Sequence, residues 1–123
     1  MKKTKTTAAP VAIDQEAPLG TTIAGTNYML YFGHNRLCRL EEMLDTSFGT
    51  ILDRVATDVD MRIIGACVQI GLEEHHLEQS RQGAAQVIEE AGIIAASAAV
   101  VKEMNATMMG IPARRAAMAK KAA

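Results

Sequence analysis

The sequence predicts an α+β protein that is mostly helical, with an N-terminal β-hairpin packed on a small bundle of four or five helices. Three observations support this fold class: two β-rich runs flank a short turn, apolar residues then recur at helical spacing, and an Ala-rich stretch covers residues 93–109. The 123 residues are enough to bury one core. We expect a single domain over residues 21–110, between a disordered leader (1–20) and a basic, Ala-rich tail (111–123).

The predicted leader holds two of the three prolines and shows no periodic apolar pattern, which is typical of disorder. Residues 21–24 and 28–32 are the two β-rich runs, and Gly25 and Asn27 lie between them. Gly and Asn tolerate the positive φ that tight hairpin turns require. An isolated hairpin is marginally stable in water, so we expect its aromatic residues to pack against a helix.

Two amphipathic helices are predicted next. The first covers residues 36–44 with Asn35 as its N-cap, and the second covers residues 48–56 with Thr46 or Ser47 as its N-cap. Each has apolar residues on one face only, so each should bury that face and expose the other. The apolar stripe of the first helix consists of Leu37, Leu40 and Leu44.

Residues 61–72 form a nearly apolar segment, which we expect to be the central helix of the bundle. Asp58 and Asp60 precede it, where negative charge favours a helix N-terminus. Gly65 and Gly71 lower its helix propensity but would allow a neighbouring backbone to approach closely.

A fourth helix is predicted from Leu77 or Ser80 to Ala91, with Gly92 interrupting or capping it. The Ala-rich residues 93–109 then form the strongest helix candidate of the chain, because Ala has the highest helix propensity. Gly110 and Pro112 should end this helix. The tail beyond it has four basic residues and no acidic one, and we expect it to be flexible or transiently helical.

Composition excludes several classes of protein. The chain has 13 Lys and Arg against 14 Asp and Glu, which argues against a protein whose main task is to neutralise phosphates. Its apolar runs are shorter than the roughly 20 residues that a bilayer span needs. The Lys-rich start is followed by acidic residues rather than an apolar signal segment, so we expect a cytoplasmic protein. Cys38 and Cys67 then fit two reduced, buried thiols.

One cluster has the residue types of a metal or acid–base site: Glu73, Glu74, His75, His76 and Glu78. It lacks the pair of histidines four residues apart that helical zinc sites use, and adjacent histidines point about 100° apart on a helix. We therefore interpret the cluster as a solvated corner between helices. The sequence also has no phosphate-binding Gly-rich loop and no evident nucleophile with a base. We predict no enzyme activity, no cofactor and no metal.

Several segments share a specific similarity with one known family. They are Tyr-Met-Leu-Tyr-Phe-Gly (28–33), Asn-Arg-Leu-Cys-Arg-Leu-Glu-Glu-Met-Leu (35–44), Ser-Phe-Gly-Thr-Ile-Leu (47–52), Gly-Leu (71–72) and Ile-Glu-Glu-Ala-Gly (88–92). In this order the chain resembles, over about residues 21–109, the phage tail assembly chaperone family. The resemblance is strongest to the small members found with gene transfer agents and siphophage-like prophages.

The resemblance implies a function in virion morphogenesis. Such a protein keeps the tape-measure protein soluble in the bacterial cytoplasm, helps recruit tail-tube protein around it, and is not retained in the finished particle. A chaperone for a long helical client needs adaptable apolar surface, and Met side chains supply it. The candidate partner-binding residues are Met104, Met108, Met109, Arg114, Arg115 and Met118.

Other interpretations stay open from the sequence. The same Met side chains would instead fill the core if they are buried, so their exposure distinguishes the two cases. The protein could also be a small structural virion component, such as a head–tail adaptor. A third alternative is a small DNA-binding helical protein that uses the basic tail, although no aromatic residue is interleaved there for base stacking.

Overall fold

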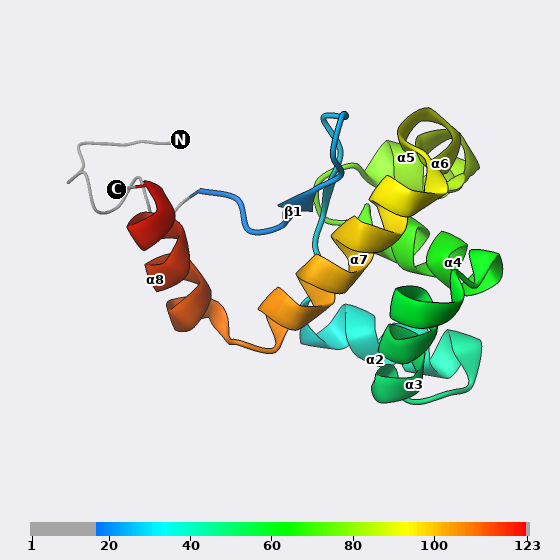
Figure 1. The fold of residues 1–123 in the computed structure, drawn as a ribbon, viewed down its shortest axis with the longest axis horizontal. Helices are drawn as coiled ribbons and strands as arrows, with labels where there is room; N and C mark the ends of the chain where they lie inside the picture. The colour runs from blue at the N-terminus through cyan, green and yellow to red at the C-terminus, as the bar shows by residue number, and fades with distance from the viewer. Residues whose placement is uncertain (1–16, 123) are drawn as a thin grey trace.

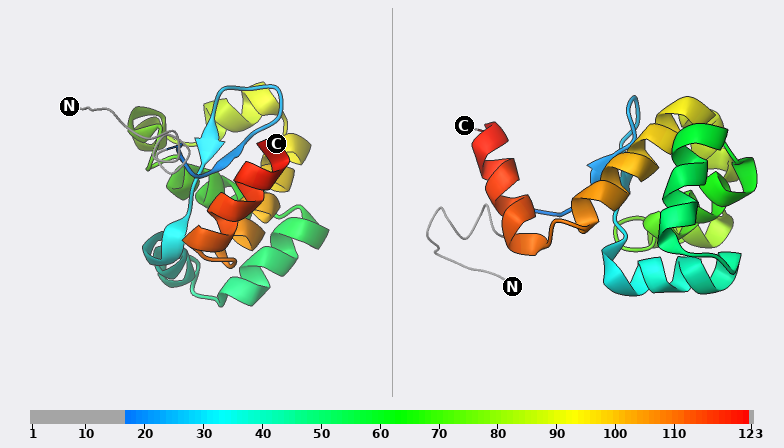
Figure 2. Two further views of the ribbon diagram at one scale, coloured as in Figure 1. Left: turned by 90° about the vertical axis from the view of Figure 1, so that its left-hand side faces the viewer. Right: turned by 60° about the horizontal axis from the view of Figure 1, so that its bottom comes forward.

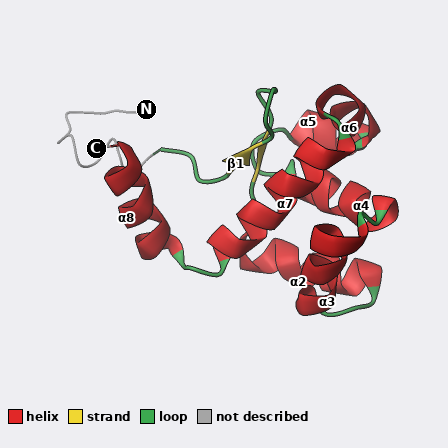
Figure 3. Cartoon of the chain, viewed as in Figure 1, coloured by secondary structure: helices red, strands yellow, loops and turns green. Residues whose placement is uncertain are grey.

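The computed structural model describes residues 17–122 and has the predicted mostly helical α+β fold, with an N-terminal hairpin on helices (Figure 1). Most of the predicted leader lies outside the described residues. Figure 3 shows how little of the described chain is strand. The elements in order are β1 (Thr21–Thr22), β2 (Met29–Leu30), α2 (Gly33–Leu44), α3 (Phe48–Asp53), the π-helical turn η1 (Arg54–Asp58), α4 (Met61–Gly71), α5 (Leu77–Gln82), α6 (Ala85–Ala91), α7 (Ile93–Thr107) and α8 (Ile111–Ala122).

The hairpin is antiparallel, with Thr21 opposite Leu30 and Thr22 opposite Met29. The strands are shorter than the predicted runs. After Leu30, the backbone N–H of the next residue bonds to a helix and not to the first strand. The N–H of Tyr31 donates to the carbonyl of Gly71, 2.9 Å away, at the end of α4. Leu30 and Phe32 have no exposed surface, so the hairpin packs on the helices as expected.

Helix α2 begins at Gly33, which corrects the predicted start at Arg36. Gly33 has φ +60°, so the chain turns into the helix directly after β2, and Asn35 lies within the first turn. The predicted Asn35 cap is therefore wrong, and the N-cap position, Phe32, makes no side-chain cap. The apolar stripe of α2 is confirmed, with Leu40 buried at its centre.

The predicted cap at Ser47 is observed, and Asp60, expected only to place negative charge before the next helix, caps that helix with its side chain. The Ser47 hydroxyl accepts a hydrogen bond from the N–H of Thr50 at 3.3 Å, and the Asp60 carboxylate accepts one from the N–H of Ile63 at 3.2 Å. The predicted helix over 48–56 is α3 continued by η1 as far as Asp58. Each cap supplies a partner for an N–H that the helix itself leaves unpaired.

Helix α4 is central, since it contacts α2, α5, α6, α7 and β2. Ile64, Cys67 and Val68 are fully buried on it. The approach of a neighbouring backbone predicted at Gly71 is present in the 2.9 Å bond from the Tyr31 N–H, and a Cβ there would also lie 3.2 Å from Leu30 and Phe32 side chains. The same prediction is wrong for Gly65, where an added Cβ would have no neighbour within 4 Å.

The predicted fourth helix is two helices, α5 and α6. Gly83 separates them with φ +102°, a value that other residues rarely adopt, and Gly92 ends α6 with φ +92°. Helix α7 then runs along α4 and reaches both hairpin strands. No helix within residues 17–122 is long and apolar enough to cross a bilayer.

The segment expected to be a flexible or transiently helical tail forms α8. Gly110, with φ +84°, turns the chain between α7 and α8. Helix α8 stands apart from α2–α7 at one end of the molecule, and the right-hand view of Figure 2 shows this separation clearly. The last residues of the predicted leader run toward it, so α8 and the start of the described chain lie on the same side (Figure 1).

Candidate functional site

The corner between α7 and α8 exposes four large apolar side chains. Met108 and Met109 are 59% and 53% exposed, Ile111 is 53% exposed, and Met118 is 39% exposed. Ile111 and Met118 lie seven residues apart and so share one face of α8. We call these four residues the α7–α8 corner. Met108, Met109 and Ile111 surround the turn itself, and Met118 lies two helical turns further along α8. Exposed apolar side chains that lie near one another are typical of surfaces that bind other proteins.

Met104 does not belong to this surface. It has no exposed area and lies in the core cluster, so its assignment as a partner contact is wrong. Met104 and Met108 are one helical turn apart on the same face of α7. The core ends between them, because Met104 is fully buried and Met108 is 59% exposed.

A buried ion pair sets the position of α8. The Arg114 guanidinium donates to both carboxylate oxygens of Glu103, at 3.0 and 2.8 Å. Glu103 has no exposed area, and Arg114 is 7% exposed. The Thr21 hydroxyl donates to the same carboxylate at 2.9 Å, so one side chain of α7 joins β1 to α8.

Arg114 and Arg115 are therefore engaged within the chain. The Arg114 guanidinium also lies over the ring of Tyr31, 5.8 Å from its centroid, and Arg115 donates to the carbonyl of Ala17. Arg114, proposed as a partner contact, is instead a positioning residue for α8. A bidentate pair with an added hydroxyl donor is geometrically demanding, so it fixes the angle between α7 and α8.

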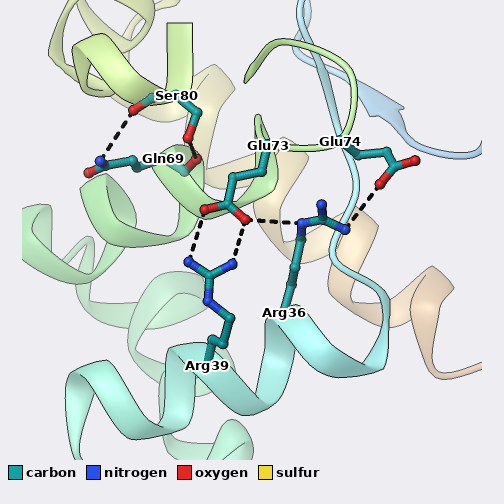
Figure 4. A network of polar contacts seen from close by, with 6 residues as sticks. All are labelled: Arg36, Arg39, Gln69, Glu73, Glu74 and Ser80. Carbon is teal, nitrogen blue, oxygen red and sulfur yellow. Dashed lines mark hydrogen bonds and ion pairs between the residues drawn. The ribbon is translucent and has the colours of Figure 1, made fainter. Parts of the chain in front are cut away.

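The predicted corner around Glu73 is a structural ion-pair network (Figure 4). Arg39 donates to both oxygens of the Glu73 carboxylate, at 2.6 and 3.0 Å, and Arg36 donates to it at 3.2 Å. Arg36 also pairs with Glu74 at 3.1 Å. These hydrogen bonds, those from Arg39 first, lower the pKa of Glu73 and raise the pKa of Arg39. The network joins α2 to the turn between α4 and α5.

The two adjacent histidines of this cluster bond to the hairpin and to the residues just before it. Nε2 of His75 donates to the carbonyl of Leu19 at 2.8 Å, and Nε2 of His76 accepts from the N–H of Met29 at 2.9 Å. Burial, and then the charge of His75, lower the pKa of His76, in keeping with a neutral acceptor nitrogen. Within residues 17–122, no three His, Cys, Asp or Glu side chains are placed to hold a metal ion.

The two cysteines differ in environment. Cys67 is buried on α4, and burial raises the pKa of its thiol to about 12. Cys38 is exposed, with its Sγ 3.5 Å from Nε2 of His34, which corrects the expectation that both thiols are buried. Residue 38 lies beside the apolar stripe of α2, on a part of the helix that stays exposed.

Sequence reasoning missed Glu103 and Ile111. A signal for Glu103 is present, because it is the single acidic residue after Glu90 and lies within an apolar, Ala-rich segment. A charge in such a segment needs a buried partner, and beyond the adjacent Lys102 the next basic residues along the chain are those of 111–123. No family model, curated protein or solved structure matches this chain.

Proposed function

We propose that this chain is a non-enzymatic assembly chaperone for a phage-type tail. In the bacterial cytoplasm it binds tape-measure protein through the α7–α8 corner and aids assembly of tail-tube protein around it. The proposal rests on the resemblance to the tail assembly chaperone family over residues 21–109. One structural observation carries the choice of surface, namely the exposure of Met108, Met109 and Ile111 around a single turn.

The proposed mechanism is reversible burial of apolar surface. A tape-measure protein is long and helical, and its apolar stripes must be covered until the tail tube encloses them. Met side chains have several rotatable bonds and a polarisable sulfur, so Met108 and Met109 can adapt to successive stripes of different shape. A client helix would lay its apolar face on the corner, as amphipathic helices do in other grooves.

The Glu103–Arg114 pair gives this surface a fixed shape. Without it, α8 would be joined to α7 mainly through the turn at Gly110, and Ile111 and Met118 would have no defined position relative to Met108. A preformed surface loses less conformational entropy when it binds a partner. The buried ion pair therefore supports binding without touching the client.

The DNA-binding alternative is less well supported. Of the four basic residues that it would use, Arg114 is buried against Glu103 and Arg115 bonds to the chain's own backbone. A phosphate-binding surface needs such groups exposed.

The adaptor alternative predicts a different content of the finished particle. Mass spectrometry of purified particles would find an adaptor in fixed stoichiometry, whereas a chaperone would be absent or nearly so.

Co-expression with a tape-measure protein tests the proposal. The wild-type chain should keep the client in the supernatant, and the Met108→Lys/Met109→Lys variant should lose this effect while its far-UV circular dichroism is unchanged. Met43→Lys is the matched control, because Met43 is 57% exposed on α2 and should tolerate the charge with full activity. A double variant that still keeps the client soluble would remove the corner from the binding site.

A further inference from the structure

Helix α8 is attached to the molecule in an unusual way. From residue 111 to 120, Arg114 alone is buried, and the apolar side chains Ile111 and Met118 face away from any core. A helix of 12 residues is marginal by itself in water, and most helices gain their stability by burying an apolar face. Helix α8 thus carries an apolar face that no other part of residues 17–122 covers.

A complementary surface lies elsewhere on the molecule. A groove of about 400 Å³ opens between α4, α6 and the start of α7. Its apolar lining includes Met61 and Gly65 on α4, Ile88 on α6 and Ile93 on α7. Met61 is 64% exposed, and no atom occupies the space into which a Cβ at Gly65 would point. We call this the α4–α6 groove.

Charge makes the two surfaces a matched pair. Glu89 lines the groove, and Glu90 beside it is exposed. Helix α8 has no acidic residue and exposes Lys120. An apolar centre with opposite charges at its edge is the usual arrangement of a specific protein interface.

We infer that α8 of one copy docks into the α4–α6 groove of a second copy. Within one copy the two surfaces lie toward opposite ends of the long axis, with α8 at the left and α4 and α6 at the right in Figure 1. The contact therefore joins copies rather than closing one copy on itself. This inference needs no client, and it goes beyond the proposed function by assigning Ile111 and Met118 of the α7–α8 corner a second contact, one that a bound client would displace.

The placement of the two surfaces limits the symmetry of the assembly. Because α8 and the α4–α6 groove are different surfaces, repeated contacts give an open chain or a closed ring, and two copies that exchange α8 reciprocally give a two-fold dimer. The contact is small, so the association should be weak and should increase with concentration.

The first variant fills the groove. Gly65→Leu should place a side chain in the open space while raising the helix propensity of α4, so the fold should be kept. Association of the purified full-length chain, measured by light scattering after gel filtration, should weaken about tenfold or more. Gly49→Leu is the matched control, because Gly49 on α3 also has open space but does not line the groove.

The second variant, Ile111→Lys/Met118→Lys, disables α8 and should be monomeric as well. A 1:1 mixture of the two variants then gives the decisive result. Each supplies the surface that the other lacks, so the mixture should form a heterodimer of about twice 13.2 kDa and assemble no further. The inference is overturned if the wild-type chain stays monomeric at the highest attainable concentration, if either variant self-associates as strongly as the wild-type chain, or if the mixture stays monomeric.

Discussion

Helices α4 and α8 are nearly equal in length, at 11 and 12 residues, yet they are held in opposite ways. On α4, Ile63, Ile64, Cys67, Val68, Ile70 and Gly71 are buried. On α8, among residues 111–120, the buried side chain is the charged Arg114, and the apolar residues are exposed. Burial of apolar area stabilises α4, whereas an ion pair positions α8. The difference separates a helix that makes the core from a helix whose apolar face is available to other chains.

The strongest test of this contrast removes the carboxylate that positions α8. Glu103→Ala should lower the free energy of unfolding by about 3–5 kcal/mol, because it leaves Arg114 with no partner at a site that is 7% exposed. Urea denaturation followed by circular dichroism measures this change. Glu90→Ala, at an exposed position on α6, should change stability by no more than about 0.5 kcal/mol. An equal effect of both variants would show that the ion pair does not stabilise the fold.

A second pair of variants compares two methionines one turn apart on α7. Met104→Ala should cost about 2–5 kcal/mol, since it opens a cavity in the core. Met108→Ala should cost about 0.5 kcal/mol or less, because Met108 is 59% exposed. Thermal unfolding of both variants measures the difference. Similar losses of stability would show that the core does not end between these two residues.

A third prediction concerns pH. The pKa of His76 is lowered from its ordinary 6.5 in the folded chain, so below that pH the unfolded chain binds a proton that the native chain does not. Stability should therefore begin to fall as the pH drops below 6.5. His76→Gln should flatten this part of the profile, and an unchanged slope would contradict the role of His76 as a neutral acceptor from Met29.

Glu73 should produce a separate step at lower pH. Its pKa is lowered from 4.5, so its contribution to stability is complete above that pH and is lost as the pH falls toward its native pKa. Glu73→Gln should remove this step while leaving the one from His76. Unfolding curves collected across the acidic range separate the two groups.

Modification of the exposed thiol should have the smallest effect on stability. The reactivity of the two thiols instead reports how exposed each one is. A thiol reagent should modify Cys38 rapidly in the native protein and should reach Cys67 only after unfolding, because Cys67 is buried and its pKa is raised to about 12. Peptide mapping after a short alkylation identifies the modified residue. Early modification of Cys67 would mean that α4 is more open than its packing indicates.

The sequence predicted the features that depend on residues close together in the chain, namely the positions of several helices and one helix cap. Helical spacing located α2 and α3, a nearly apolar run located α4 and Ala content located α7, while the cap at Ser47 follows from a side chain beside the helix start. The start of α2 was misplaced because Gly33 allows a turn that helix propensity alone does not indicate. The split between α5 and α6 depends in the same way on the φ of Gly83.

The candidate site was less predictable, because burial depends on where distant elements end. Met104 and Met108 have the same residue type and the same helix face, and only the extent of the packing against α7 separates them. The position of α8 depends on the ion pair between Glu103 and Arg114, which are eleven residues apart. Thr21 also bonds to the Glu103 carboxylate, and the Tyr31 ring lies under the Arg114 guanidinium, so the pair depends on contacts with the distant hairpin. Sequence periodicity carries no information about such contacts.

Hydrogen exchange of the chain with and without tape-measure protein tests the central claim most directly. If the α7–α8 corner binds the client, amides around residues 105–120 should exchange more slowly in the complex, while those of α4 should be unchanged. Protection confined to other elements, or no protection in a complex that does form, would contradict the assignment of this surface.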